Sequence, residues 1–260
     1  LSATLWLHQE RKKQNKVSSN LKGFLGLAPV YSVNESVKHH RTVEEVLADI
    51  ENRHHLSQTD GAVNPADNQF NHSDWKTLPF SEIEVRVIED LFAAKGLTAK
   101  TYLHQAATAS NFKTAAQHYQ YLHIAAHGDF NEAHPELTAI IFSPDEATNS
   151  DPLFYMSDAY NLQLNADLVV LSCCDSGVGK EVTGEGVMAM NRGFLYAGAQ
   201  NVIYTLFKVA DQESSQLTQY LFTQILQNKP PLQALRQAKL EMIKTGYLPV
   251  YWSGYVLLGN

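Results

Sequence analysis

Two residues with the chemistry of a nucleophile and a base follow apolar segments that are typical of buried strands. His127 comes directly after "YLHIAA" (121–126), and Cys174 comes directly after "DLVVLSC" (167–173). Because the carboxyl ends of parallel strands meet at one edge of a sheet, we expect both side chains to emerge there. A thiol is only slightly ionised at neutral pH, and histidine is the usual base that activates it. The pattern predicts a Cys-His dyad, with the backbone N–H groups of Gly128 and Cys174 as donors to a substrate oxyanion.

A purely structural interpretation of Cys174 stands beside this one, since a lone cysteine at the end of an apolar strand is most often a small packing residue. The combination of motifs weighs against it. His-Gly follows one strand and Cys-x-x-Gly follows a later one, and His127 precedes Cys174 by 47 residues. This is similar to the arrangement in caspases, where the histidine precedes the cysteine by about 50 residues. The local caspase signature, with glycine two residues after the cysteine, is absent.

Metal and phosphate chemistry fit the same residues poorly. His123 and His127 are four residues apart, as in a helical zinc site, but position 124 is isoleucine instead of the catalytic glutamate. In a strand, four residues span about 13 Å, which is too far for one metal ion. His123 is therefore predicted to be a satisfied core residue. The "CDSGVGK" stretch lacks the arginine of a cysteine phosphatase at Lys180, and it lacks the first glycine and the final Ser or Thr of a nucleotide-binding loop.

The segments that must position the dyad alternate between strand and helix patterns. Before residue 76 the sequence predicts a buried strand at 22–31, a helical candidate at 41–55 and a long surface loop at 57–74. After it, a helix at 81–96 begins with a Ser81 cap and Glu84 as its capping-box partner, and ends at Gly96. The remaining elements are strands at 97–105, 120–128, 166–174, 201–207 and 254–259, helices at 107–118, 184–198, 211–227 and 231–244, and a hairpin or pair of crossing strands at 136–144 and 152–160. Strands that are apolar on both faces and alternate with helices indicate a mainly parallel sheet covered on both sides.

The composition argues against several classes of partner. The chain carries 20 basic and 27 acidic residues, a net charge of −7, which gives no general footprint for nucleic acid. No apolar run approaches the roughly 18 residues that a membrane-spanning helix needs, so no membrane contact is predicted. Two adjacent cysteines cannot link distant segments, which favours a reducing compartment and a cytoplasmic location. The chain begins at Leu1 with a plausible helix, which suggests a piece of a longer protein.

Four blocks of sequence carry a resemblance to a known family: "YLHIAAHG", "ADLVVLSCCDSGVG", "GEGVMAMNRGFLYAGAQNVIYTLFKVAD" and "PVYWSGYVLLG". In order and spacing they resemble the CHAT domain, a caspase-like cysteine-protease domain that is often attached to tetratricopeptide repeats. The family pattern has a strand ending in His-Gly, a Leu-Ser-Ala-Cys-Glu-Thr-Gly stretch, a Gly-Glu-Gly helix, a Leu-Trp-x-Val-x-Asp strand end and a Trp before the last strand. The resemblance covers roughly residues 76–260, and "FLGLAPVY" (24–31) fits the first core strand.

This resemblance implies an α/β, caspase-like fold with a mainly parallel six-stranded sheet and helices on both faces. One such domain would occupy residues 1–260. Within it, residues 1–20 form an N-terminal helix or linker from an absent upstream region, residues 21–75 hold the first core strand and a variable insertion, and residues 76–260 form the catalytic core. The four glycines within 176–186 suggest a loop that becomes ordered as the dyad assembles.

Laid on the family pattern, "LSCCDSG" places Cys174 on the nucleophile and Cys173 on the family's alanine. Cys173 is then expected to point the other way along the strand and to serve as packing. The departures from the pattern are mild: Asp175 and Ser176 replace Glu and Thr, and Phe207 replaces the usual Trp.

The expected function is that of a cysteine endopeptidase, in which Cys174 attacks a peptide carbonyl and His127 transfers the proton, without a metal or organic cofactor. The resemblance further implies a protein or peptide substrate and control by an upstream repeat region or an activating protein, in bacterial defence or regulated cell death. The candidates for substrate binding are Asp211, Asp129, Asp175 and Glu185, although an aspartate before a helix, such as Asp211, is usually its N-cap. The alternative is a catalytically silent caspase-like module that binds partners, and a reactive-thiol probe would separate the two.

Overall fold

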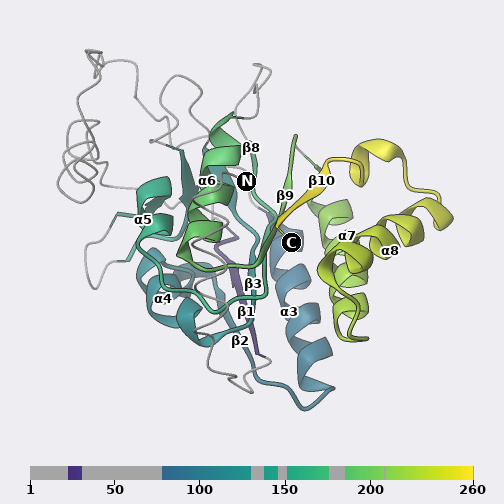
Figure 1. Ribbon diagram of the computed structural model, residues 1–260, viewed down its shortest axis with the longest axis horizontal. Coiled ribbons are helices and arrows are strands. Elements are labelled where there is room, and N and C mark those ends of the chain that lie inside the picture. The colour runs from purple at the N-terminus through teal and green to yellow at the C-terminus, as the bar shows by residue number, and fades with distance from the viewer. Residues whose placement is uncertain are drawn as a thin grey trace.

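Short apolar strands form a six-stranded sheet in the computed structural model of the protein, which describes residues 23–30, 78–129, 138–145, 151–175, 185–207 and 209–259 (Figure 1), with the backbone alone at 174–175 and 185–189. The strand order is β10-β9-β7-β3-β1-β2. All neighbours run parallel except β10, which is antiparallel to β9. The strands are β1 (Phe24–Ala28), β2 (Ala99–Leu103), β3 (Tyr121–Ile124), β7 (Leu168–Leu171), β9 (Asn201–Thr205) and β10 (Tyr255–Gly259). The predicted mixed α/β class with a mainly parallel six-stranded sheet is confirmed.

Helices cover both faces of this sheet because the strands are apolar on both faces. Alternate residues of β7 point to opposite sides, so that Leu168 and Val170 join one core and Val169 and Leu171 join the other. One face carries α3 (Pro79–Ala93), α7 (Asp211–Ile225) and α8 (Pro231–Lys244), and the other carries α4 (Ala109–Ala115), α5 (Met156–Tyr160) and α6 (Glu185–Ala197).

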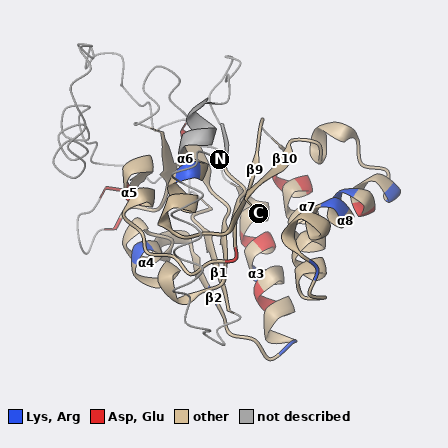
Figure 2. Ribbon diagram, in the orientation of Figure 1, with Lys and Arg blue, Asp and Glu red and all other residues tan. Residues whose placement is uncertain are grey.

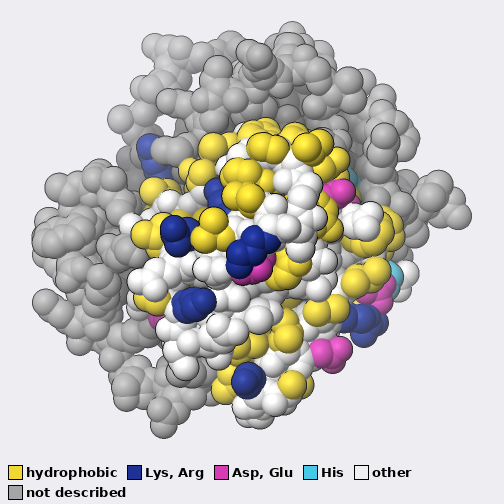
Figure 3. Space-filling view, turned by 90° about the vertical axis from the view of Figure 1, so that its right-hand side faces the viewer, with side chains coloured by type: hydrophobic (Ala, Val, Ile, Leu, Met, Phe, Trp, Pro, Cys, Tyr) yellow, Lys and Arg dark blue, Asp and Glu magenta, His cyan; other side chains and the backbone are white. Residues whose placement is uncertain are grey.

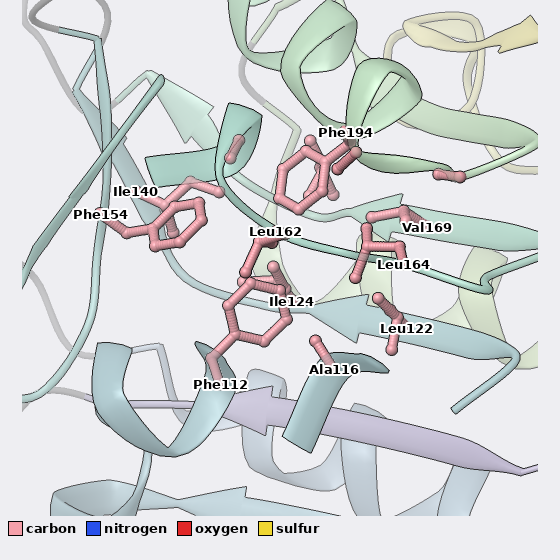
Figure 4. Close-up of a cluster of buried hydrophobic side chains, with 14 of the residues drawn as sticks. Phe112, Ala116, Leu122, Ile124, Ile140, Phe154, Leu162, Leu164, Val169 and Phe194 are labelled. Atoms are coloured by element: carbon pink, nitrogen blue, oxygen red, sulfur yellow. The ribbon is translucent and has the colours of Figure 1, made fainter. Parts of the chain in front are cut away.

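Aromatic side chains fill both cores. Beneath α3 and α7, the ring centroid of Phe24 lies 5.2 Å from that of Phe92 and 5.4 Å from that of Phe222. On the opposite face, Phe112, Phe154 and Phe194 converge from three different elements, as Figure 4 shows. Their centroids are 5.4 to 6.3 Å apart. These distances are those of stacked and edge-to-face pairs, which stabilise the packing of helices on the sheet.

The beginning of α3 differs from the prediction, whereas its end agrees. Ser81 is not the N-cap, since the helix begins at Pro79 after Leu78, and the Ser81 hydroxyl donates to the Leu78 carbonyl at 2.6 Å. Pro79 explains the earlier start, because proline is favoured at the first position of a helix. After the helix, Gly96 adopts a φ of +69°, the left-handed conformation that glycine tolerates best and that ends many helices.

A second, four-stranded sheet was not predicted. Its order is β6-β5-β4-β8, with β4 (His127–Asp129), β5 (Ala139–Ile141), β6 (Leu153–Tyr155) and β8 (Cys174–Asp175). The antiparallel pairing of β5 with β6 confirms the hairpin. The continuous strands predicted at 120–128 and 166–174 are wrong, because each is split between the two sheets. An unbroken apolar run looks the same in one long strand and in two short ones, so periodicity gave no signal of the break.

The strand predicted at 152–160 is wrong in its second half, because β6 ends at Tyr155 and Met156–Tyr160 form the helix α5. The remaining predicted elements that the structure describes agree in type and place, including the short helix at 107–118, which continues as a 3-10 turn, η4 (Ala116–His118). Within the described ranges, no helix combines the length and hydropathy needed to cross a membrane. The candidate helix at 41–55, the surface loop at 57–74 and most of the glycine-rich loop at 176–186 lie outside the described residues. The division of the chain into segments 1–20, 21–75 and 76–260 stays a prediction.

Candidate active site

The backbone places His127 and Cys174 side by side on neighbouring strands. In the parallel pair β4–β8, His127 is the partner of Cys174, and Gly128 is the partner of Asp175. Paired strands lie about 4.8 Å apart in a sheet, so the backbones of these two residues lie side by side. The two segments that the sequence predicted to be neighbours therefore meet, at the end of the large sheet where its parallel strands finish.

The register of the large sheet produces this meeting. β3 and β7 pair in parallel, with Ile124 opposite Leu171 at the last position. Three residues further along each strand, His127 is again opposite Cys174, because the two connections are equally long. The Ser172 N–H donates to the Ile124 carbonyl at 2.9 Å and keeps the two connections together. The separation of 47 residues between His127 and Cys174 therefore equals the separation between Ile124 and Leu171, which are paired in the β3–β7 register.

Cys173 has the packing role that was expected of it. Its side chain is 5% exposed and belongs to the core on the α4, α5 and α6 face. Its thiol donates to the Ile124 carbonyl at 3.6 Å, and its own carbonyl accepts a bond of 3.4 Å from the Thr205 hydroxyl. A buried thiol among aliphatic side chains behaves as a small apolar residue and is not available to a substrate.

The surroundings of His127 are enclosed. His127 is 6% exposed, and Gly128 is buried between two neighbouring strands, since β4 pairs with β5 on one side and with β8 on the other. In such a strand the backbone N–H groups are directed toward one neighbour or the other. The proposed use of the Gly128 and Cys174 N–H groups as oxyanion donors stays a prediction.

Two of the four candidate acids lie on the strands that carry the dyad, and a third begins the helix that follows the glycine-rich loop. Asp129 is half-buried and is the last residue of β4, and Asp175 follows Cys174 in β8. Glu185 is the first residue of α6, which follows the glycine-rich loop. Their use in substrate binding stays a prediction. The described residues contain no group of three or more His, Cys, Asp or Glu side chains arranged to hold a metal ion.

Asp211 has a different structural role from the one expected. The N-cap of α7 is Ala210, so the expectation that Asp211 caps its own helix is wrong. Its carboxylate instead accepts a 2.8 Å hydrogen bond from the Phe80 N–H at the start of α3, a helix whose own N-cap, Leu78, has no acceptor side chain. Burial raises the pKa of Asp211 to about 6, the Phe80 N–H opposes this rise, and the nearby Glu84 adds to it. A role for Asp211 in substrate binding remains a prediction.

A buried contact between Glu84 of α3 and His123 of β3 was not predicted from the sequence. β3 is the strand that leads to His127. His123 Nε2 lies 2.8 Å from Glu84 Oε1, close enough for an ion pair when His123 is protonated, although the contact is not aligned as a hydrogen bond. The Thr218 hydroxyl donates to the same Glu84 oxygen at 2.7 Å. The prediction that His123 is a core residue is confirmed, but the expectation that its polar atoms are satisfied is wrong, because neither ring nitrogen makes a hydrogen bond in the described structure. The capping-box role of Glu84 is also wrong. The spacing of Ser81, Glu84, Ile88 and Phe92 on one face of α3 was the signal that Glu84 is buried.

Comparisons with known proteins identify the family of the chain. The family model of the CHAT domain matches residues 28–260. Tetratricopeptide repeat protein 28 from Homo sapiens is 24% identical over 224 residues, which cover 72% of this chain and 9% of the human protein. The protein of the same name from Mus musculus is 31% identical over 110 residues, 42% of this chain and 4% of the mouse protein. The chain thus spans less than a tenth of the length of these curated relatives.

Proposed function

The chain belongs to the CHAT domain family, and we propose that it is a caspase-like cysteine endopeptidase whose dyad consists of Cys174 and His127. The observation that carries this proposal is the strand register that makes His127 the partner of Cys174. A base beside a thiol raises the fraction of thiolate, which is the form that attacks carbonyl groups. A silent binding module would be expected to have lost one of the dyad residues, whereas this chain keeps both Cys174 and His127.

In the proposed reaction, the Cys174 sulfur attacks the carbonyl carbon of a peptide bond and its proton passes to His127. The negative charge that develops on the carbonyl oxygen is held by backbone N–H groups, for which Gly128 and Cys174 are the candidates. His127 then donates the proton to the departing amine as the C–N bond breaks. Water, deprotonated by His127, hydrolyses the thioester and releases the acid and the thiol.

The names and lengths of the relatives support a proposal about the region that controls this activity. Both are named for tetratricopeptide repeats and are far longer than this chain. We propose that this domain likewise works with a tetratricopeptide-repeat region, which selects the protein substrate or controls the dyad. The acids Asp129 and Asp175 lie beside the dyad positions and would favour a basic residue before the cut. A cytoplasmic location and a bacterial origin are part of the same proposal. The two relatives named above come from mammals.

A thiol probe tests the proposal directly, because the adjacent cysteine provides a matched control. A peptidyl acyloxymethyl ketone should label the 260-residue chain at Cys174, and Cys174→Ala should abolish labelling, whereas Cys173→Ala should retain it. His127→Gln should slow labelling by about 10²–10⁴-fold, as expected for loss of a general base. His118→Gln is the control for the histidine, since His118 is exposed on η4.

Cleavage of a peptide library would then define the residue before the cut. Asp129→Asn and Asp175→Asn should reduce any preference for lysine or arginine. If labelling of Cys174 is slow and indifferent to His127→Gln, both in the isolated chain and with a repeat-containing activator, the endopeptidase proposal fails and a binding module remains.

A further inference from the structure

Apolar side chains are exposed mainly on one side of the described structure. Eight large apolar residues are exposed among the described residues, and six of them come from the end of β9 or from the α8 region, whereas Ile83 lies on α3 and Tyr196 on α6. Leu206 and Phe207 follow β9, while Leu232, Ile243, Leu248 and Val250 lie on or just after α8. Figure 3 shows apolar side chains gathered on this side, with lysine and arginine side chains beside them. Clusters of this kind, unlike single exposed residues, mark interaction surfaces.

α8 presents a regular stripe to solvent. Leu232, Arg236, Lys239 and Ile243 follow one another at intervals of four, three and four residues, which aligns them along one side of a helix. Leu232 is 64% exposed and Ile243 is 47% exposed. The face that packs against the core consists of other residues, namely Ala234, Leu235, Ala238 and Met242. Two aliphatic side chains thus flank two cationic ones on this face, where Arg236 is exposed and Lys239 is half-buried.

The stripe continues beyond the end of α8 onto an ordered turn, η6 (Pro249–Tyr251). Leu248 is 63% exposed and Val250 is 51% exposed. The turn is held by a 3.2 Å bond from Trp252 Nε1 to the Tyr247 carbonyl, and Lys239 Nζ lies 3.5 Å from the Ser253 carbonyl. The first contact closes the turn, and the second connects the turn to α8. We call Leu232, Arg236, Lys239, Ile243, Leu248 and Val250 the α8 surface.

The charge of the α8 surface is opposite to that of the whole chain. Between residues 227 and 253 the sequence has four basic residues and one acidic residue, whereas the chain as a whole has a net charge of −7. Figure 2 shows basic residues along α8 and acidic residues on α3 and α7. The one acid, Glu241, accepts hydrogen bonds from Lys244 and Gln237. Arg236 and Lys239, in the middle of the stripe, keep an uncompensated positive charge in the described structure.

We propose that the α8 surface binds an amphipathic helix of another protein, on which aliphatic and acidic side chains share one face. Such a helix would place aliphatic residues against Leu232 and Ile243 and carboxylates near Arg236 and Lys239, while its end would reach Leu248 and Val250. Apolar burial supplies affinity in this mode of recognition, and the charges select the partner and its orientation. The proposal does not depend on proteolysis, because no dyad residue takes part.

The test uses the complete 260-residue chain and a fluorescein-labelled helical peptide of roughly 16 residues, with leucines at i, i+4, i+7 and i+11 flanked by glutamates. Fluorescence anisotropy should show binding that weakens with salt. Arg236→Glu with Lys239→Glu should weaken it by at least about tenfold, and so should Leu232→Ser with Ile243→Ser. A peptide with lysines in place of the glutamates should prefer the Arg236→Glu, Lys239→Glu variant. Lys95→Glu and Ile83→Ser, which alter exposed residues on α3 or just after it, are the controls and should bind as the unaltered chain does.

Equal binding of the two peptides, or variants at the α8 surface that bind like the controls, would overturn the proposal. Two other occupants give distinct results. If the chain dimerises in sedimentation velocity and Leu232→Ser with Ile243→Ser makes it monomeric, the surface is a self-association site instead. If the glutamate peptide binds only after residues 36–72 are deleted, the occupant is the acidic helical candidate of the chain itself. Either result refutes a helix from another protein.

Discussion

Replacing Glu84 by leucine removes one half of a buried pair, and we expect the free energy of unfolding to fall by about 3–5 kcal/mol. Glu84 is 1% exposed and His123 is 0% exposed, so no water can solvate the group that remains. Thr218 contributes little to the loss, because its hydroxyl can donate instead to the Ser214 carbonyl, 3.0 Å away, or to the Ser215 carbonyl, 3.1 Å away. The cost therefore arises from leaving the His123 imidazole without its partner in an apolar core.

The double variant Glu84→Leu, His123→Leu distinguishes this explanation from a simple loss of packing. With both groups replaced by leucine, the Thr218 hydroxyl keeps its backbone acceptors and no unpaired ionisable group remains beside Phe222, so we expect most of the lost stability to return. Urea unfolding at pH 7, followed by circular dichroism, would give the free energies of the four chains of the cycle. The pair is coupled if the double variant is at least about 2 kcal/mol more stable than the sum of the two single losses predicts. Additive losses, or single losses below about 0.5 kcal/mol, would refute the reasoning.

Three further predictions concern packing and pH. Gly26→Ala should destabilise the protein by about 1–3 kcal/mol in urea unfolding, because its Cβ would lie 2.5 Å from Val85 Cγ1. Phe154→Ala should cost about 3–5 kcal/mol in the same assay, since it empties the centre of an aromatic cluster in which Phe154 is fully buried. Asp211→Asn tests the raised pKa: folding favours the protonated acid, whose pKa rises from 3.8 to about 6. Relative to Asp211→Asn, the unaltered chain should therefore gain stability as the pH falls from 7 to 4, by about 1–2 kcal/mol once solvent screening of this half-buried group is allowed for. A constant difference between the two chains across that pH range would contradict the assignment.

Much of the fold was predictable because local pattern and tertiary burial agree. The strands of the large sheet are short apolar runs, and the helices between them place apolar residues at a spacing of three and four. The α/β alternation then leaves few topologies other than a sheet with helices on both faces. The resemblance to the family pattern assigned Cys174 as the nucleophile, which stays a prediction, and the alternation of side chains along a strand predicted that Cys173 is a packing residue, which its burial confirms.

The features that were missed depend on contacts between segments far apart in the sequence. Glu84 has the spacing of both a capping-box residue and a buried residue, and only the presence of His123 on β3 decides between them. Asp211 stands where a helix N-cap is common, yet it caps α3, which begins 132 residues earlier. Local sequence rules predict that such a side chain will pair with a hydrogen-bond donor or acceptor, but they do not predict which segment of the chain supplies that partner.

The register between β3 and β7 changes how the spacing of the dyad should be interpreted. The sequence drew attention to His127 and Cys174 because 47 residues separate them, which resembles the separation in caspases. Yet β4, β5, β6, α5 and their connections lie between the two residues, and lengthening any loop there would alter the count without moving either strand. What brings the residues together is that each lies three positions beyond a pair of residues that are already in register, Ile124 and Leu171. Equal connections of Ala125–Ala126 and Ser172–Cys173 are therefore the sequence feature that the geometry requires. One residue inserted into either connection would shift His127 against Cys174 by one position and, because strand side chains alternate, would direct them to opposite faces.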